Sequence, residues 1–252
     1  MTGPRGDAFE IMNAYAAGPV VIVCEHASNH IPDRYDGLGL DAQTRDSHIA
    51  WDPGAEGVAQ GLAAALDAPM IAGRISRLVY DCNRPPEAPS AIPARSAGIE
   101  VPGNAGLSEA GRAARVADVY VPFCHALENL IAERGRAGTP FALITVHSFT
   151  PVWQGMPRDV EIGVLHDEDA RLADAMLAEK PCGRVMQRNA PYGPKDGVTH
   201  TLRRHGLANA LPNVMIEIRN DLIASAAQQA RIADALVSML RVALARSGTR
   251  DA

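Results

Sequence analysis

Two histidines stand directly after stretches that predict buried strands. His26 comes two residues after the apolar run 20–24, and His147 directly follows the apolar run 141–146. Zinc in catalytic sites is bound by three protein ligands and a water, often two histidines and one carboxylate. A single histidine is more often a structural or surface residue, but two at the ends of separate buried strands favour a shared metal ion. The pair therefore predicts two ligands of a metal site.

The third ligand would be a carboxylate, and Asp52, Glu25 and Glu217 are the candidates. Asp52 also has an ordinary structural explanation, because Asp followed by Pro is a common helix start with the Asp as N-cap. His48 lies near Asp52 in the sequence, and its role stays open.

Glu217 stands inside the apolar stretch 214–218, which predicts a buried strand. An isolated buried carboxylate is costly, so it is either paired with a cation or functional. Arg219 is two residues further on, hence on the same face of the strand, and could be that partner. A glutamate beside a metal-bound water is a common general base. The sequence therefore makes Glu217 a candidate base.

Arginines and a tyrosine on predicted loops could hold a substrate. Arg84 enters the Pro-rich stretch 82–106, and its planar guanidinium suits a substrate carboxylate because it can make two charge-assisted hydrogen bonds. Arg77 is a weaker candidate for the same role. The loop 189–198 has the composition of a mobile lid, from which Tyr192 could reach a polar substrate. Both segments could equally be ordinary surface loops.

These side chains need a sheet whose strands bring them to one edge. Strands are predicted at 20–24, 69–72, 77–81, 141–146, 160–165, 184–187 and 214–219. Helices are predicted at about 53–66, from 108 to about 131, and at about 168–179, 199–205 and 224–245. The alternation of strands and helices indicates a single α/β domain over residues 1–252, with a mostly parallel or mixed sheet and helices on both faces. Ligands bind past the carboxyl ends of the strands in such sheets.

The composition excludes several classes of protein. Of the 252 residues, 47% are hydrophobic, which is enough for one α/β domain with a full core. The net charge of −5 and the 4% aromatic content argue against a nucleic-acid partner, which would require a basic surface or stacking rings. No apolar run reaches the ~18 residues that a membrane span needs, and the N-terminus lacks a signal peptide. We expect a cytoplasmic protein that could form homo-oligomers and whose four cysteines are ordinary buried thiols.

Four short motifs together resemble the N-formylglutamate amidohydrolase family over roughly residues 18–225. They are EHASN at 25–29, HIAWDPGA at 48–55, YDCNRP at 80–85 and VHS at 146–148. The family is in turn similar to zinc carboxypeptidases. The resemblance implies a carboxypeptidase-like fold and a bound Zn²⁺.

The same resemblance implies roles for individual residues. His26 and His147 would bind the zinc, Asn83 and Arg84 would hold a substrate carboxylate, and Glu217 would be the base. Carboxypeptidases have a glutamate ligand three residues after the first histidine, where this chain has Asn29.

If the segment 29–47 is an insertion, Asp52 takes the place of that glutamate as the third ligand, with Glu25 and Asn29 as rivals. Tyr192 would correspond loosely to the tyrosine of the carboxypeptidase lid. Arg219 would stabilise the developing oxyanion or neutralise Glu217.

The expected function is that of a metal-dependent amidohydrolase with zinc as its ion. Its small-molecule substrate would be an N-formyl or N-acyl amino acid, and N-formylglutamate, cleaved to glutamate and formate, is the candidate. One alternative is a non-catalytic protein of the same fold that binds an acidic metabolite or a metal. Another is a carboxypeptidase, or a deacylase acting on a different amino acid.

Overall fold

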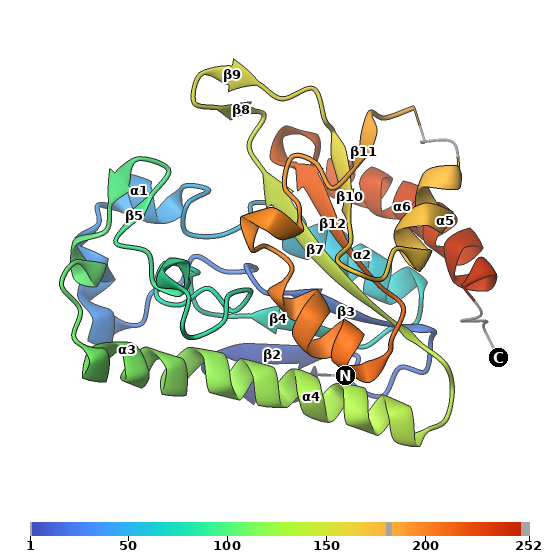
Figure 1. The fold of residues 1–252 in the computed structure, drawn as a ribbon, viewed down its shortest axis with the longest axis horizontal. Helices are drawn as coiled ribbons and strands as arrows, with labels where there is room; N and C mark the ends of the chain where they lie inside the picture. The colour runs from blue at the N-terminus through green and yellow to red at the C-terminus, as the bar shows by residue number, and fades with distance from the viewer. Residues whose placement is uncertain (1, 180–182, 248–252) are drawn as a thin grey trace.

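The computed structural model describes residues 2–179 and 183–247 and has an eight-stranded sheet at its centre (Figure 1). The strand order is β1-β2-β4-β3-β7-β12-β10-β11. Pairing is parallel between β4 and β3, β3 and β7, β7 and β12, and β10 and β11, and antiparallel at the other three interfaces. This mixed sheet confirms the α/β class.

The strands of the large sheet are short, and two small ribbons project from it. The sheet contains β1 (Thr2–Gly6), β2 (Phe9–Met12), β3 (Val20–Cys24), β4 (Met70–Gly73), β7 (Ala142–Phe149), β10 (Ile162–Leu165), β11 (Met186–Arg188) and β12 (Asn213–Arg219). The ribbons pair β5 (Arg95–Ser96) with β6 (Ile99–Glu100), and β8 (Val152–Trp153) with β9 (Met156–Pro157).

Helices cover both faces of the sheet, as the sequence predicts. One face packs against α2 (Ala55–Ala65), α5 (Arg171–Ala178) and α6 (Ala226–Arg246). The other packs against α4 (Val121–Arg136), which continues from α3 (Glu109–Arg115) through a π-helical turn, η4 (Val116–Tyr120) (Figure 1). The other helical segments described are short: η1 (Asp33–Gly39), α1 (Ala42–Asp46), η2 (Pro89–Ala91), η3 (Pro102–Asn104), η5 (Pro194–Asp196), η6 (Leu202–Gly206), η7 (Leu207–Asn209) and η8 (Asn220–Leu222). No helix in the described part of the chain is both long and apolar enough to cross a membrane.

Strand β3 lies in the middle of this arrangement and is buried along its whole length. Ile22 packs in the core on the α2 side, whereas Val21 and Val23 pack in the core on the α4 side. Full burial of one such side chain stabilises the fold by about 1.5–3 kcal/mol. The strand is therefore firmly anchored, and the residues that follow it start from a fixed position.

The register between β7 and β12 places two polar side chains on the same face of the sheet. His147 on β7 is paired with Glu217 on β12 in the parallel ladder. Because side chains alternate between faces, these two point to the same side. Their neighbours Val146 and Ile216 point to the opposite side and pack in the core with α2 and α6.

Three elements differ from the sequence predictions. Residues 77–81 form a turn, because the Ser76 hydroxyl donates to the Ala50 carbonyl (2.8 Å) and accepts from the Leu78 amide (3.2 Å). Helix α2 begins at Ala55, so Asp52 is not its N-cap. Strands β1 and β2 were not predicted, and they extend the sheet beyond β4.

Hydrogen bonds near the C-terminal end of the Pro-rich segment 82–106 hold this segment in place. The Asn104 amide donates to the carbonyls of Leu78 and Pro93, both at 2.8 Å, and Arg115 of α3 donates to Gly103 at 2.9 Å. This loop is therefore tied to the body of the domain.

The cysteines behave as expected where they are described. Cys24, Cys82 and Cys124 are buried free thiols, and burial raises the pKa of each. Cys182 lies outside the described residues.

Candidate metal centre and active site

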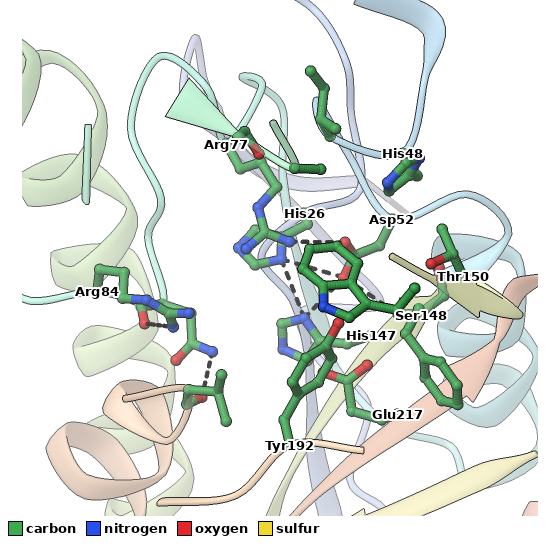
Figure 2. A pocket seen from close by; sticks show the side chains of 17 residues that line it. His26, His48, Asp52, Arg77, Arg84, His147, Ser148, Thr150, Tyr192 and Glu217 are labelled. Atoms are coloured by element: carbon green, nitrogen blue, oxygen red, sulfur yellow. Dashed lines mark hydrogen bonds and ion pairs between the residues drawn. The ribbon is translucent and has the colours of Figure 1, made fainter. Parts of the chain in front are cut away.

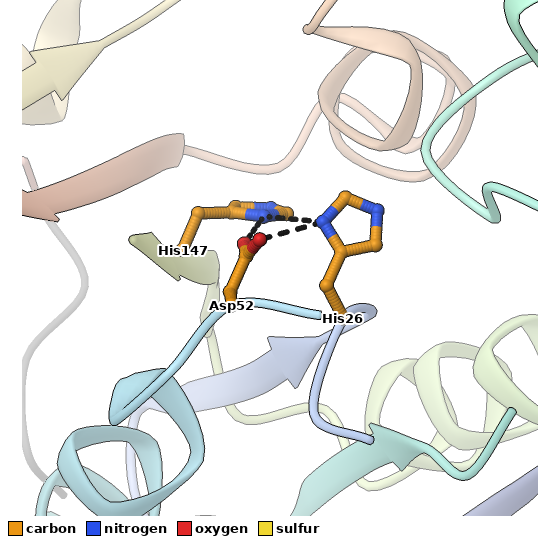
Figure 3. A group of neighbouring side chains, drawn as sticks. All are labelled: His26, Asp52 and His147. Atoms are coloured by element: carbon orange, nitrogen blue, oxygen red, sulfur yellow. Dashed lines mark hydrogen bonds and ion pairs between the residues drawn. The ribbon is translucent and has the colours of Figure 1, made fainter. Parts of the chain in front are cut away.

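His26, Asp52 and His147 meet at the carboxyl ends of β3 and β7, and we refer to them as the His–Asp–His group (Figure 3). Asp52 Oδ2 lies 3.2 Å from His26 Nδ1 and 3.0 Å from His147 Nδ1. The two Nδ1 atoms are 3.2 Å apart. All three side chains are buried. Two histidines that are 121 residues apart in the sequence therefore present the same ring nitrogen to one point.

This geometry fits a metal ion. Zinc binds imidazole nitrogens and carboxylate oxygens at about 2.0–2.2 Å, which places the ligand atoms of a tetrahedral site a little over 3 Å apart. The three donor atoms here have that spacing. When both Nδ1 atoms are unprotonated, their lone pairs and the Asp52 carboxylate converge on one point. A cation satisfies both nitrogens and the carboxylate together.

The far nitrogen of each ring meets a second carboxylate. His26 Nε2 lies 2.7 Å from Asp81 Oδ1, and His147 Nε2 lies 3.2 Å from Glu25 Oε2. The second contact is an ion-pair distance without the alignment of a hydrogen bond. Glu25 is held in turn by the Thr201 hydroxyl, which donates to Oε1 at 2.5 Å. Carboxylates behind histidines fix the ring tautomer and orientation at metal sites.

Arg77 ties two of these acids together. Its guanidinium donates to Asp52 Oδ1 at 3.2 Å and to Asp81 Oδ2 at 2.8 Å. Burial alone would raise the pKa of Asp52, but His26, His147 and Arg77 hold it far below its ordinary value. Asp52 is therefore ionised, as a metal ligand must be.

The two rival ligands have other partners. The Asn29 amide donates to the Arg45 carbonyl (3.2 Å) and to Asp46 (2.9 Å), so it belongs to the segment that precedes α2. Glu25 faces the far side of the His147 ring. Of the candidates that the sequence left open, Asp52 is the one whose carboxylate joins the two Nδ1 atoms.

Glu217 faces the same pocket and is buried. Burial, and secondarily the charge of Asp52, raise its pKa to about 7, although His147, Arg77 and His26 act in the other direction. Its Oε2 atom has no hydrogen-bond partner among the described residues. Glu217 thus presents an unsatisfied carboxylate oxygen whose proton affinity suits acid–base chemistry near neutral pH.

The expected pairing of Glu217 with Arg219 is wrong. The Arg219 guanidinium donates to Asp221 Oδ1 (2.8 Å) and to the Arg158 carbonyl (2.8 Å), and Arg219 does not line the pocket. Asp221, immediately beyond the end of β12, is close enough to take this cation. Arg77 is the arginine whose positive charge acts on Glu217.

The pocket above the His–Asp–His group has a volume of about 230 Å³ (Figure 2). Its other lining residues come mainly from loops and strand ends: His48, Ile49, Arg77, Asn83, Arg84, Ser96, Ala97, Ser148, Phe149, Thr150, Trp153, Tyr192, Val198 and Glu217. Figure 2 shows Arg84 and His48 on opposite sides of the group. The pocket is therefore polar at its base and small.

The candidate substrate-binding residues all lie in this pocket, but they are held differently. Within the described part of the chain, the Arg84 guanidinium makes one hydrogen bond, to the neighbouring Asn83 carbonyl (2.8 Å), which leaves most of its donors available. The side-chain amide of Asn83 bonds to the segment 198–201. It donates to the Val198 carbonyl (2.6 Å) and accepts from the Thr201 amide (3.0 Å). Asn83 thus fastens the segment that carries Thr201.

Several residues of the site had no role in the sequence analysis. The sequence patterns predict no role for Asp81, Thr201 or Trp153, and they do not settle the role of His48. Asp81 carried a usable signal, since it stands in the motif that also contains Arg84. Nothing in the sequence pattern around Thr201 or Trp153 indicates that Thr201 contacts Glu25 or that Trp153 lines the pocket.

Comparisons with known proteins identify the family and the fold. The family model described as N-formylglutamate amidohydrolase matches residues 18–224. The crystal structure of a gene product from Agrobacterium tumefaciens is 53% identical, has a TM-score of 0.94, and covers 96% of this chain and 97% of that one.

The crystal structure of N-formylglutamate amidohydrolase from Ralstonia eutropha has 19% identity and a TM-score of 0.62, covering 96% and 99% of the two chains. At this identity it supports the fold alone. A comparison with curated protein sequences gives no match.

Proposed function

The chain belongs to the N-formylglutamate amidohydrolase family, and on that premise we propose that it is a metal-dependent hydrolase of N-acylated amino acids. N-formylglutamate is the substrate that we propose, with glutamate and formate as products. The observation that carries the proposal is the buried His–Asp–His group, whose three donor atoms lie 3.0–3.2 Å apart. It shares the pocket with Glu217, whose Oε2 has no hydrogen-bond partner among the described residues.

His26 and His147 would hold the metal through Nδ1, and Asp52 would hold it through Oδ2. We propose zinc because two imidazoles and one carboxylate are a common catalytic zinc set. When bound, the ion would polarise the amide carbonyl and lower the pKa of a water molecule toward ~7. Asp81 orients the His26 ring, the Glu25 carboxylate lies behind the His147 ring, and Arg77 keeps Asp52 and Asp81 in place.

Glu217 acts as the general base. Its side chain lines the pocket, and its carboxylate takes a proton from the attacking water. Glu217 then passes this proton to the amide nitrogen as the C–N bond breaks. The hydroxyl of the water stays on the formyl carbon, so the balance gives formate and an amine.

Arg84 would bind the carboxylate of the amino acid. Its guanidinium lines the pocket and retains free donors, and a bidentate pair with a carboxylate also fixes its orientation. Fixing that end of the substrate places the amide at the metal and at Glu217. A pocket of about 230 Å³ suits a small metabolite.

The alternative of a non-catalytic metabolite-binding protein is less well supported. A binding site would need Arg84 but not an unsatisfied buried carboxylate, which is costly to maintain. Glu217 therefore favours catalysis. The single-domain organisation over residues 1–252, the cytoplasmic location, self-association and a likeness to zinc carboxypeptidases stay predictions.

A substrate panel tests the proposal. Purified protein is incubated with N-formyl, N-acetyl and longer acyl derivatives of glutamate, aspartate, glutamine and leucine, and with glutamate-ended dipeptides. We expect hydrolysis of N-formylglutamate, loss of that activity with a chelator, and its return with zinc. Turnover that is unaffected by complete metal removal would refute the metal-dependent mechanism, and preferred cleavage of the peptides would identify a carboxypeptidase.

A further inference from the structure

Arg158 lies behind the aromatic wall of the pocket. Phe149, Trp153 and Tyr192 line the cavity, whereas Arg158 does not. The Arg158 guanidinium lies over all three rings, at 5.3 Å from the centroid of Phe149, 5.3 Å from Trp153 and 5.0 Å from Tyr192. One cation therefore contacts each aromatic residue of this wall.

The three rings belong to separate segments of the chain. Phe149 is the last residue of β7, Trp153 stands on the β8–β9 ribbon, and Tyr192 stands on the loop 189–198. Arg158 follows β9 directly, and its position there is well defined.

Hydrogen bonds at the base of the ribbon fix that position. The Arg158 amide donates to the Pro151 carbonyl (2.8 Å), and the Nη1 atom donates to the Thr150 carbonyl (3.3 Å). Arg219 donates to the Arg158 carbonyl at 2.8 Å. The guanidinium thus reaches the Tyr192 loop from a fixed base.

The contact between Arg158 and Tyr192 has a defined direction. Arg158 Nη2 lies 3.0 Å from the Tyr192 phenol oxygen. A guanidinium can only donate, so the phenol oxygen is the acceptor and its own hydrogen remains available. No acceptor for that hydrogen is found among residues 2–179 and 183–247. In Figure 2 the Tyr192 ring extends from its loop toward the side of the pocket where His147 and Asp52 lie.

We propose that Arg158 is a positioning residue, which holds the Tyr192 phenol as a hydrogen-bond donor directed at the oxygen of the scissile amide. This inference rests on the proposed function. That oxygen gains negative charge as water adds to the carbon, and a donor already in place there lowers the barrier. A cation on the phenol oxygen also polarises the O–H bond, which strengthens the donated hydrogen bond.

A double-mutant cycle tests this coupling. Tyr192→Phe removes the donor and is expected to lower kcat about 100-fold, in the range found for the loss of one oxyanion donor. Arg158→Met is expected to lower kcat about 10-fold or more, with less than about a 3-fold change in KM, because the phenol remains but is no longer oriented. In the Tyr192→Phe background, Arg158→Met should change kcat less than about 2-fold, since Arg158 then has no phenol to orient.

Two further variants distinguish an effect on the orientation of the Tyr192 phenol from an effect on folding. Arg158→Lys keeps a donor to the phenol oxygen and should restore part of kcat. Arg171→Met is the matched control, because Arg171 pairs with Asp169 on the exposed surface and does not line the pocket. Equal losses of kcat from Arg158→Met in the wild-type and Tyr192→Phe backgrounds would overturn the inference, as would a lack of any loss.

An NMR measurement tests the same contact without activity. The ¹³Cζ resonance of Tyr192, assigned by its absence in Tyr192→Phe, responds to hydrogen bonding at the phenol oxygen. We expect it to move in Arg158→Met and to move less in Arg158→Lys. An unmoved resonance overturns the inference whether or not the protein hydrolyses acyl amino acids. Absence of hydrolysis by the wild-type protein would instead refute the proposed function.

Discussion

Replacing Glu217 by Gln should lower activity and raise the stability of the metal-free protein. The substitution keeps the shape of the side chain but removes the oxygen that accepts the proton. General base catalysis contributes a factor of about 10²–10⁴, so kcat should fall by that factor, equivalent to about 3–5 kcal/mol. Substrate binding depends on Arg84, so KM should change little.

The stability change follows from the burial of the same group. Burial raises the pKa of Glu217 to about 7, against an ordinary value of 4.5. The folded protein therefore binds this proton more tightly than the unfolded chain does, and stability falls as the pH rises from about 4.5 to about 7. The difference corresponds to about 3 kcal/mol at pH values above the folded pKa.

Glutamine has no such pH-dependent cost. Without metal, the Glu217→Gln protein should therefore be more stable than wild type at pH 8 by up to about 3 kcal/mol, and the difference should shrink toward pH 5. A bound cation would lower the pKa of Glu217 and reduce the effect.

The assays are steady-state kinetics on N-formylglutamate with zinc, and urea unfolding of the metal-free proteins at pH 5 and pH 8. Glu168→Gln is the matched control, because Glu168 is exposed. Unchanged kcat in Glu217→Gln would refute its role as base. A metal-free variant that is less stable than wild type at pH 8 would refute the reasoning from burial.

Three other changes give separate tests. Asp81→Asn removes the carboxylate behind His26 (2.7 Å) and should weaken zinc binding about 10–100-fold in a competition titration, whereas an unchanged affinity would show that Asp81 does not support the ring. Arg84→Met should raise KM about 10–100-fold with the exposed Arg95→Met as control, and an unchanged KM would exclude the carboxylate contact. Burial lowers the pKa of His205 to about 4, so protonation opposes folding as the pH drops below about 6.5. Relative to His205→Gln, wild type should lose about 2 kcal/mol of stability between pH 7 and pH 5 in urea unfolding, and equal losses would contradict this.

The sequence predicts the parts of the site that follow strands. Largely apolar runs identify β3, β7 and β12, and the polar residues within them or just after them include His26, His147 and Glu217. Because parallel strands bring their carboxyl ends to one edge, the sequence positions alone indicate that these side chains meet. The structure brings them to one pocket.

The parts that depend on loop conformation could not be predicted in this way. The stretch 77–81 has the composition of a strand, yet hydrogen bonds of Ser76 to residues on both sides make it a turn. That turn is what lets Arg77 reach both Asp52 and Asp81. The spacing of residues along the sequence does not predict such contacts between side chains.

The same limit applies to Arg219. Its spacing from Glu217 correctly places both on one face of β12, but Asp221 lies close enough to take the cation instead. Whether Arg219 pairs with Glu217 or with Asp221 depends on the path of the chain beyond the end of β12. The alternation of side chains along the strand does not predict that path.

The zinc content of the purified protein shows whether the His–Asp–His group holds one metal ion. Wild-type protein and His147→Ala are each equilibrated with Zn²⁺, dialysed against metal-free buffer and assayed by elemental analysis, with circular dichroism to check that both are folded. We predict one zinc per wild-type chain and little or none in the folded variant. No zinc in the wild-type protein, or an equal amount in both proteins, would contradict the account.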